Sequence, residues 1–153
     1  MDPLSIAAST TSLVLFASEV SNLAKDLYFA VKQKPELLRR ISDEIYQLQL
    51  VLLHVGQYCQ GANSSSLAAV FGSCEGTLRA IQTRLTSLRA LFSQGTLSRL
   101  LAFRKFKDEM KEIEELRKHL ESSKVTLGIA LQVRRMQVAR KSTYLLRVLV
   151  PAC

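Results

Sequence analysis

The chain has 153 residues, 48% hydrophobic and 22% charged, which is typical of one globular domain large enough to bury a core without disulfides or metals. Its cysteines, Cys59, Cys74 and Cys153, have no C-x-x-C spacing, which argues against a disulfide framework or zinc site and favours small buried thiols in a reducing compartment. The formal charge is +8, and residues 134–153 carry five bases and no acid, so the basic charge is concentrated at one end.

Only 6 Gly and 3 Pro interrupt the chain, and apolar residues recur at alternating steps of three and four, which predicts a few long amphipathic helices. We expect a single domain over residues 1–153. Its helices are expected at about residues 3–33, 35–59, 65–92, 97–131 and 132–150.

The first helix is expected to begin at Asp2-Pro3, where a capping side chain precedes a residue with fixed φ. Its first 18 residues contain no base, unlike a secretory signal, and they are too short and too rich in serine and threonine to span a bilayer. We therefore expect a cytoplasmic protein. The apolar positions of this helix are Leu13, Phe16, Val20, Leu23, Leu27 and Ala30.

The second and third helices carry the most regular apolar stripes. The stripe of the second helix is Leu38, Ile41, Ile45, Leu48, Leu52 and Val55. The stripe of the third helix is Leu67, Phe71, Cys74, Leu78, Ile81, Leu85, Leu88 and Phe92. We expect the core to include Ile41, Ile45, Leu48, Leu78, Ile81, Leu85 and Ile113.

The last helical region runs from Leu97 to about Val150, and we expect a break near Gly128 or at Arg134-Arg135 that divides it into a fourth and a fifth helix. Short loops between such segments favour packing within one chain over an intermolecular coiled coil. The prediction is an all-α fold, an antiparallel four- to five-helix bundle.

No residue pattern predicts catalysis or cofactor binding. Glu112, Glu115 and His119 share one helix face, but a metal site in a bundle needs ligands from several helices, so we interpret this face as solvated. The chain has no P-loop, no G-x-G-x-x-G and no G-x-S-x-G. We expect no cofactor, no metal and no small-molecule substrate. Nucleic acid is also not expected, because Tyr144 is the basic segment's only aromatic residue.

Three stretches carry a family resemblance: the opening MDPLSIAAS, residues 36–45 (ELLRRISDEI), and residues 106–131. They resemble the N-terminal helical domain of fungal STAND or NLR-like proteins, a version of which also occurs in an azaphilone pigment cluster protein. The resemblance spans roughly residues 1–131, and the domain is similar to HeLo-like bundles. The sequence has no nucleotide-binding module, so we expect a free-standing copy or part of a longer protein.

The resemblance implies a helical bundle that signals after oligomerisation, in some members by engaging a membrane with its first helix. We therefore expect a non-enzymatic interaction domain of cell-death or heterokaryon-incompatibility signalling. The alternative is a scaffold or regulator of fungal secondary metabolism without a membrane role. Expected partners are proteins, a second copy, and an anionic membrane at which the protein is peripheral.

Two groups of residues are the candidates for this contact, the charge-free part of the first helix and the basic segment near the C-terminus. They are Leu4, Ile6, Leu13, Leu15, Phe16, Arg134, Arg135, Arg140 and Lys141. The competing expectation is that the first helix only supplies core.

Overall fold

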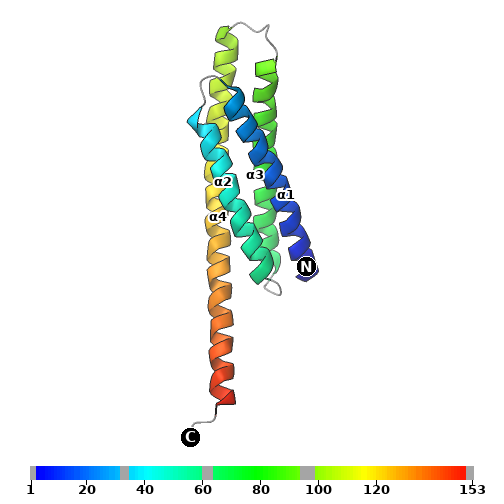
Figure 1. The fold of residues 1–153 in the computed structure, drawn as a ribbon, viewed down its shortest axis with the longest axis vertical. Helices are drawn as coiled ribbons and strands as arrows, with labels where there is room; N and C mark the ends of the chain where they lie inside the picture. Colours follow the sequence, from blue (N-terminus) through cyan, green and yellow to red (C-terminus); the bar gives the residue numbers. More distant parts are fainter. Residues whose placement is uncertain (1–2, 32–34, 60–63, 94–98, 151–153) are drawn as a thin grey trace.

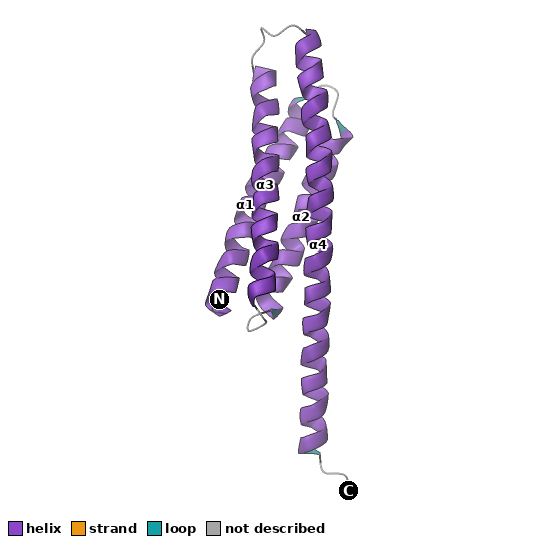
Figure 2. Cartoon of the chain, turned by 180° about the vertical axis from the view of Figure 1, so that it is seen from behind, coloured by secondary structure: helices purple, strands orange, loops and turns teal. Residues whose placement is uncertain are grey.

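The computed structural model describes residues 3–31, 35–59, 64–93 and 99–150, and within these ranges the fold is all-α, with no strand. Four helices pack against one another (Figures 1 and 2). They are α1 (Pro3–Ala30), α2 (Glu36–Tyr58), α3 (Ser64–Ser93) and α4 (Arg99–Leu149).

Consecutive helices run in opposite directions, as Figure 1 shows. The helices that pack side by side are α1 with α2, α1 with α3, α2 with α4, and α3 with α4. Consequently α1 lies diagonally across from α4, and α2 from α3. The predicted antiparallel order therefore applies to neighbours in sequence, whereas the packed pairs α1–α3 and α2–α4 are parallel.

The core lies where the four apolar stripes meet, and every residue predicted for it is fully buried: Ile41, Ile45, Leu48, Leu78, Ile81, Leu85 and Ile113. The stripe predicted for α2 is buried throughout, and that of α3 is buried except for Phe92. On α1 the core line differs from the prediction, because Ala17 and Ala24 are fully buried while Phe16 and Leu23 are only partly so.

The helices α1 and α2 approach closely through small and hydroxylated residues. The Oγ atoms of Ser21 and Ser42 lie 3.0 Å apart in the buried seam. At Gly56 an added Cβ would stand 2.6 Å from Oγ1 of Thr10, so glycine is what allows the two backbones this separation.

The predicted break in the last region is wrong, because α4 is one continuous helix of 51 residues. Gly128 costs a helix only about 1 kcal/mol relative to alanine, and an added Cβ would meet no neighbouring atom there, so nothing in the packing forces the chain to turn. The second proposed break, Arg134-Arg135, also lies within the helix, and both arginines contact Tyr58 at the end of α2. The predicted fifth helix, residues 132–150, is therefore the lower part of α4.

Candidate functional site

The lower end of α4 is the most unusual surface of the molecule. Figure 1 shows α4 continuing past the ends of the other three helices. Residues 136–149, which we call the α4 extension, are all exposed, although α4 is buried at Leu131 just above them. The large apolar side chains that the extension exposes are Met136, Val138, Tyr144, Leu145, Leu146, Val148 and Leu149. An extension of 14 residues is about 21 Å long at 1.5 Å per residue.

Two of the predicted contact residues, the half-buried Arg134 and the exposed Arg135, contact the end of α2 at the start of this segment. Nε of Arg134 donates a hydrogen bond of 3.3 Å to the carbonyl oxygen of Tyr58, the last residue of α2. The guanidinium of Arg135 lies 5.5 Å from the centroid of the Tyr58 ring, which stacks in turn on His54. The other two predicted bases, Arg140 and Lys141, lie within the extension and are exposed.

The extension has one charge-free side. At 100° per residue, Val138, Leu145, Leu146 and Leu149 project from one half of the helix, with Ala139 and Ser142 between them. The three bases of the extension, Arg140, Lys141 and Arg147, project from the other half, together with Gln137, Tyr144 and Val148. After Glu121 the printed sequence contains no acid. The extension is therefore an amphipathic helix with apolar and basic sides, and neither side is covered by the described chain.

The five residues predicted as a contact face on α1 do not share a face. Ile6 and Leu13 are buried in the core, whereas Leu15 points to solvent. Phe16 is half-buried between these two directions, and the side chain of Leu4 lies outside the described part of the chain. The described residues thus agree with the competing expectation that the first helix supplies core.

A shallow groove of about 640 Å³ separates the first halves of α1 and α3. Its walls are mostly small residues, including Ser9, Ser12 and Gly72. Its charged residues, Glu75 and Arg79, pair with each other at 2.8 Å, and Arg79 also lies 5.5 Å from the ring centroid of Phe16. The groove brings together no nucleophile and base at hydrogen-bonding distance, so it offers no acid–base chemistry of its own.

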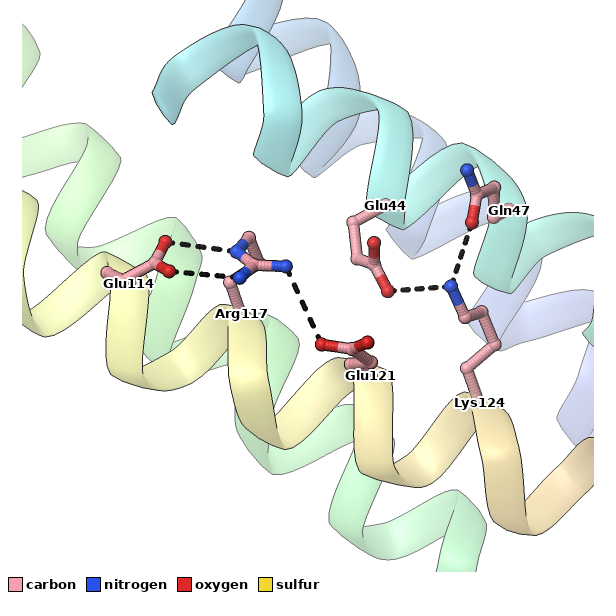
Figure 3. A network of polar contacts seen from close by, with 6 residues as sticks. All are labelled: Glu44, Gln47, Glu114, Arg117, Glu121 and Lys124. Atoms are coloured by element: carbon pink, nitrogen blue, oxygen red, sulfur yellow. Dashed lines mark hydrogen bonds and ion pairs between the residues drawn. The ribbon is translucent and has the colours of Figure 1, made fainter. Parts of the chain in front are cut away.

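A network of polar contacts lies along the seam between α2 and α4 (Figure 3). Nζ of Lys124 donates hydrogen bonds to Oε1 of Glu44 at 2.7 Å and to Oε1 of Gln47 at 2.8 Å. Seven residues before Lys124, or about two turns away, Arg117 forms a two-pronged pair with Glu114 and an ion pair of 3.7 Å with Glu121, all within α4. The hydrogen bonds from Arg117 hold the pKa of Glu114 below its ordinary value. This seam fixes how α4, and with it the extension, sits against α2.

Both described cysteines are free and buried, as predicted, and burial raises the pKa of each thiol. Glu112, Glu115 and His119 are all exposed, with Glu115 paired to Lys118 at 3.0 Å. Over the described ranges, no three His, Cys, Asp or Glu side chains gather as a metal ion would require. None of the described helices combines the length and apolar character needed to cross a bilayer.

Sequence reasoning missed the apolar side of the extension, because Val138, Leu145 and Leu149 have the composition and spacing of core residues. The sequence predicts them as part of a separate fifth helix over about residues 132–150. The signal that could have separated them is the step from Leu131, since Val138 and Leu145 follow it at intervals of seven without interruption. An uninterrupted interval predicts that the same helix continues, and a continuing helix must outrun the shorter helices α1 and α2.

A family model described as the N-terminal region of pigment biosynthesis cluster protein PigL matches residues 1–149. No curated protein and no solved structure matches the chain. The match reaches the last residue of α4, so the matched region includes the extension.

Proposed function

The chain belongs to the family of the N-terminal domain of pigment biosynthesis cluster protein PigL, and from this premise we propose that it is a non-enzymatic interaction domain whose contact surface is the α4 extension. The bundle holds the extension in a fixed direction, and the extension binds the partner. This proposal places the contact on α4 and not on the first helix.

The observation that carries the proposal is the exposure of an apolar helix outside the bundle. Contiguous exposed apolar side chains mark interaction sites in stable proteins. Leu145 and Leu149 are 56% and 74% exposed, respectively. Covering such side chains is worth roughly 1.5–3 kcal/mol each when burial is complete. The extension is therefore better explained as one side of an interface than as a surface that remains exposed to solvent.

The biological setting of this contact has two candidates. The family description supports a scaffold or regulator in a pigment biosynthesis cluster. The sequence resemblance to fungal STAND N-terminal domains supports a signalling role, in which oligomerisation of the bundle transmits a cell-death or incompatibility signal. Both settings need the same surface, and we favour the first because it takes its support from the matched family.

An anionic membrane is the other partner that the charges allow. Bases near a charged leaflet contribute about 1 kcal/mol each, and Arg140, Lys141 and Arg147 are placed for this on the basic side. The first helix supports this reading less well, since Ile6 and Leu13 would have to leave the core before they met lipid.

The proposal is tested by site-specific photocrosslinking in the cells that produce the protein. A photoreactive phenylalanine analogue replaces Leu145 in one version and Phe29 in the matched control, which is also apolar, on a helix and exposed, but lies on α1. We expect strong adducts from position 145 and few from position 29. Equal or absent labelling at both positions would contradict the proposed contact surface.

A further inference from the structure

The apolar side of the extension projects in the same direction from α4 as the residues that contact α2 higher up. Arg135, which contacts Tyr58, marks the α2 side of α4. Ser142, Leu146 and Leu149 follow Arg135 at 7, 11 and 14 residues, so they project within about 40° of its direction. Lys124, which binds Glu44 on α2, lies 18 residues before Ser142, that is five full turns above it on the same line. The apolar side therefore lies directly below the end of α2.

This arrangement makes a step, with the end of α2 as its upper wall and the extension as its side. The step has the width of one helix, because it continues the space that α2 occupies higher up. A flat bilayer cannot cover it evenly, since α2 stands out on that side by about one helix diameter, roughly 10 Å. A helix of about the length of the extension fills it.

We propose, on the basis of the proposed function above, that the occupant is the α4 extension of a second copy, lying antiparallel to the first. Antiparallel pairing places each extension below the α2 end of the other copy. A parallel pair would put the second bundle where the first copy's α2 already stands. The contact is isologous, the commonest arrangement of soluble dimers, and each copy supplies the same apolar residues.

The residue types fit this pairing. Val138, Leu145, Leu146 and Leu149 bury one another, and Ser142 at the middle of the extension allows the two helices to approach closely near the two-fold axis. Arg140, Lys141 and Arg147 lie on the half that faces away from the second helix. The apolar stripe is also continuous with the core through Leu131, so the dimer extends the intramolecular packing from one bundle to the other.

The bases give the dimer a diagnostic salt dependence. Two extensions of the same positive charge repel each other at low ionic strength, and salt screens that repulsion over a Debye length that shrinks to about 3 Å at 1 M. Dimerisation should therefore strengthen as salt is added. Binding to an anionic membrane or an acidic protein would instead weaken, because salt screens attraction in those cases.

The test is the concentration dependence of mass of the full 153-residue chain, measured by sedimentation at about 0.05 M and about 0.5 M NaCl. We expect a monomer–dimer equilibrium that tightens with salt. The double variant L145Q/L149Q should weaken it by about tenfold or more. The matched variant Y144Q/V148Q removes exposed apolar side chains from the opposite half and should leave it unchanged. Circular dichroism checks that both variants remain helical.

A second measurement reports the geometry directly. In a Cys153→Ser background, Ser142→Cys should form an intermolecular disulfide on mild oxidation, whereas Gln137→Cys, on the opposite half of the helix, should not. A monomer at every concentration, or a dimer indifferent to L145Q/L149Q, would overturn the proposal. The chain could instead stay monomeric and bind phosphatidylserine vesicles through Leu145 and Leu149, with binding that weakens as salt is added. That result would overturn the second copy as the occupant, but it would leave the proposed interaction function standing.

Discussion

Arg134 of α4 caps α2: its Nε–H donates a hydrogen bond to the carbonyl oxygen of Tyr58, the residue at which α2 ends. The last turn of α2 contains no base of its own. A positive group at a helix C-terminus stabilises the unpaired carbonyls and the negative end of the helix dipole. Arg134 therefore supplies from another helix what α2 lacks, and it does so at the point where α4 leaves the bundle.

Replacing Arg134 by Gln should lower the free energy of unfolding by about 1 kcal/mol, the usual worth of such a cap and its charge. The control is R140Q, which removes the same charge from the exposed extension and should change stability by less than about 0.5 kcal/mol. Urea unfolding followed by circular dichroism measures both, at low protein concentration so that association does not contribute. Equal effects of the two substitutions would show that the cap adds no stability.

Among the four glycines that the structure describes, Gly56 should be the least tolerant of replacement. An added Cβ would stand 2.6 Å from Oγ1 of Thr10, whose hydroxyl is buried and bonded to the carbonyl of Ile6. We expect Gly56→Ala to cost about 1–3 kcal/mol through overpacking. Thr10→Ala removes the obstructing atoms, so the double variant should be more stable than the sum of the single effects predicts.

The matched controls for this prediction are the glycines within α3 and α4. At Gly76 and Gly128 an added Cβ meets nothing within 4 Å. Each alanine substitution should therefore raise the free energy of unfolding by up to about 1 kcal/mol, since alanine is the better helix former. Thermal or urea unfolding measures the change in the free energy of unfolding for each alanine substitution. If this change had the same sign at Gly56, Gly76 and Gly128, the assignment of close packing to Gly56 would be contradicted.

The sequence predicts the helices α2 and α3 and their core faces well, because both carry strong stripes at steps of three and four with polar residues between them. It predicts the core side of α1 less well. From Pro3 to Ser18, α1 contains no charged residue, so no charged side of the helix marks the direction of solvent. The core side is set instead by Ala17 and Ala24, whose small size fits the close approach of α2.

The continuity of α4 is not marked at the two expected breaks themselves, but by the interval of seven from Leu131 to Val138 and Leu145. Gly128 costs a helix only about 1 kcal/mol and arginine is a good helix former, so neither position ends α4, and both arginines also contact Tyr58. The candidate site depends on that continuity.

Glu114 should contribute to the pH dependence of stability. The hydrogen bonds from Arg117 lower the pKa of Glu114 in the folded chain relative to the unfolded chain. A group of this kind stabilises fully above its unfolded pKa, about 4.3, and its contribution is lost as the pH falls through the lowered folded pKa. E114Q should therefore unfold more easily than the parent at pH 7, by about 0.5 kcal/mol.

The same substitution should make the acid side of the stability curve shallower, and the two proteins should converge once the pH has fallen below the lowered folded pKa of Glu114, where its carboxyl is protonated in both states. Urea unfolding between pH 2 and pH 7 gives both curves. Parallel curves with a constant offset would mean that the effect of E114Q comes from packing and not from the charge of Glu114.

Lys124 and Glu44 should be the most strongly coupled ion pair of the bundle. Their side chains are only 21% and 13% exposed, and Nζ of Lys124 lies 2.7 Å from Oε1 of Glu44 across the α2–α4 seam. Removing one partner leaves the other charge partly buried and unpaired, which costs more than the loss of an exposed ion pair. In a double-mutant cycle with K124M and E44Q, we expect a coupling free energy of about 1–2 kcal/mol.

The comparison pair for that cycle is Lys118 and Glu115, which lie 3.0 Å apart but are 57% and 58% exposed. Solvent screens this pair, and its coupling should be about 0.3–0.5 kcal/mol. Added salt should remove most of the Lys118–Glu115 coupling and little of the Lys124–Glu44 coupling, because buried pairs are less screened. If the two couplings were equal and equally sensitive to salt, solvent would screen the Lys124–Glu44 pair as strongly as the exposed Lys118–Glu115 pair. The direction of the extension would then depend on the apolar contacts of Leu120 and Leu127 and on the Arg134 cap, without help from the ion pair.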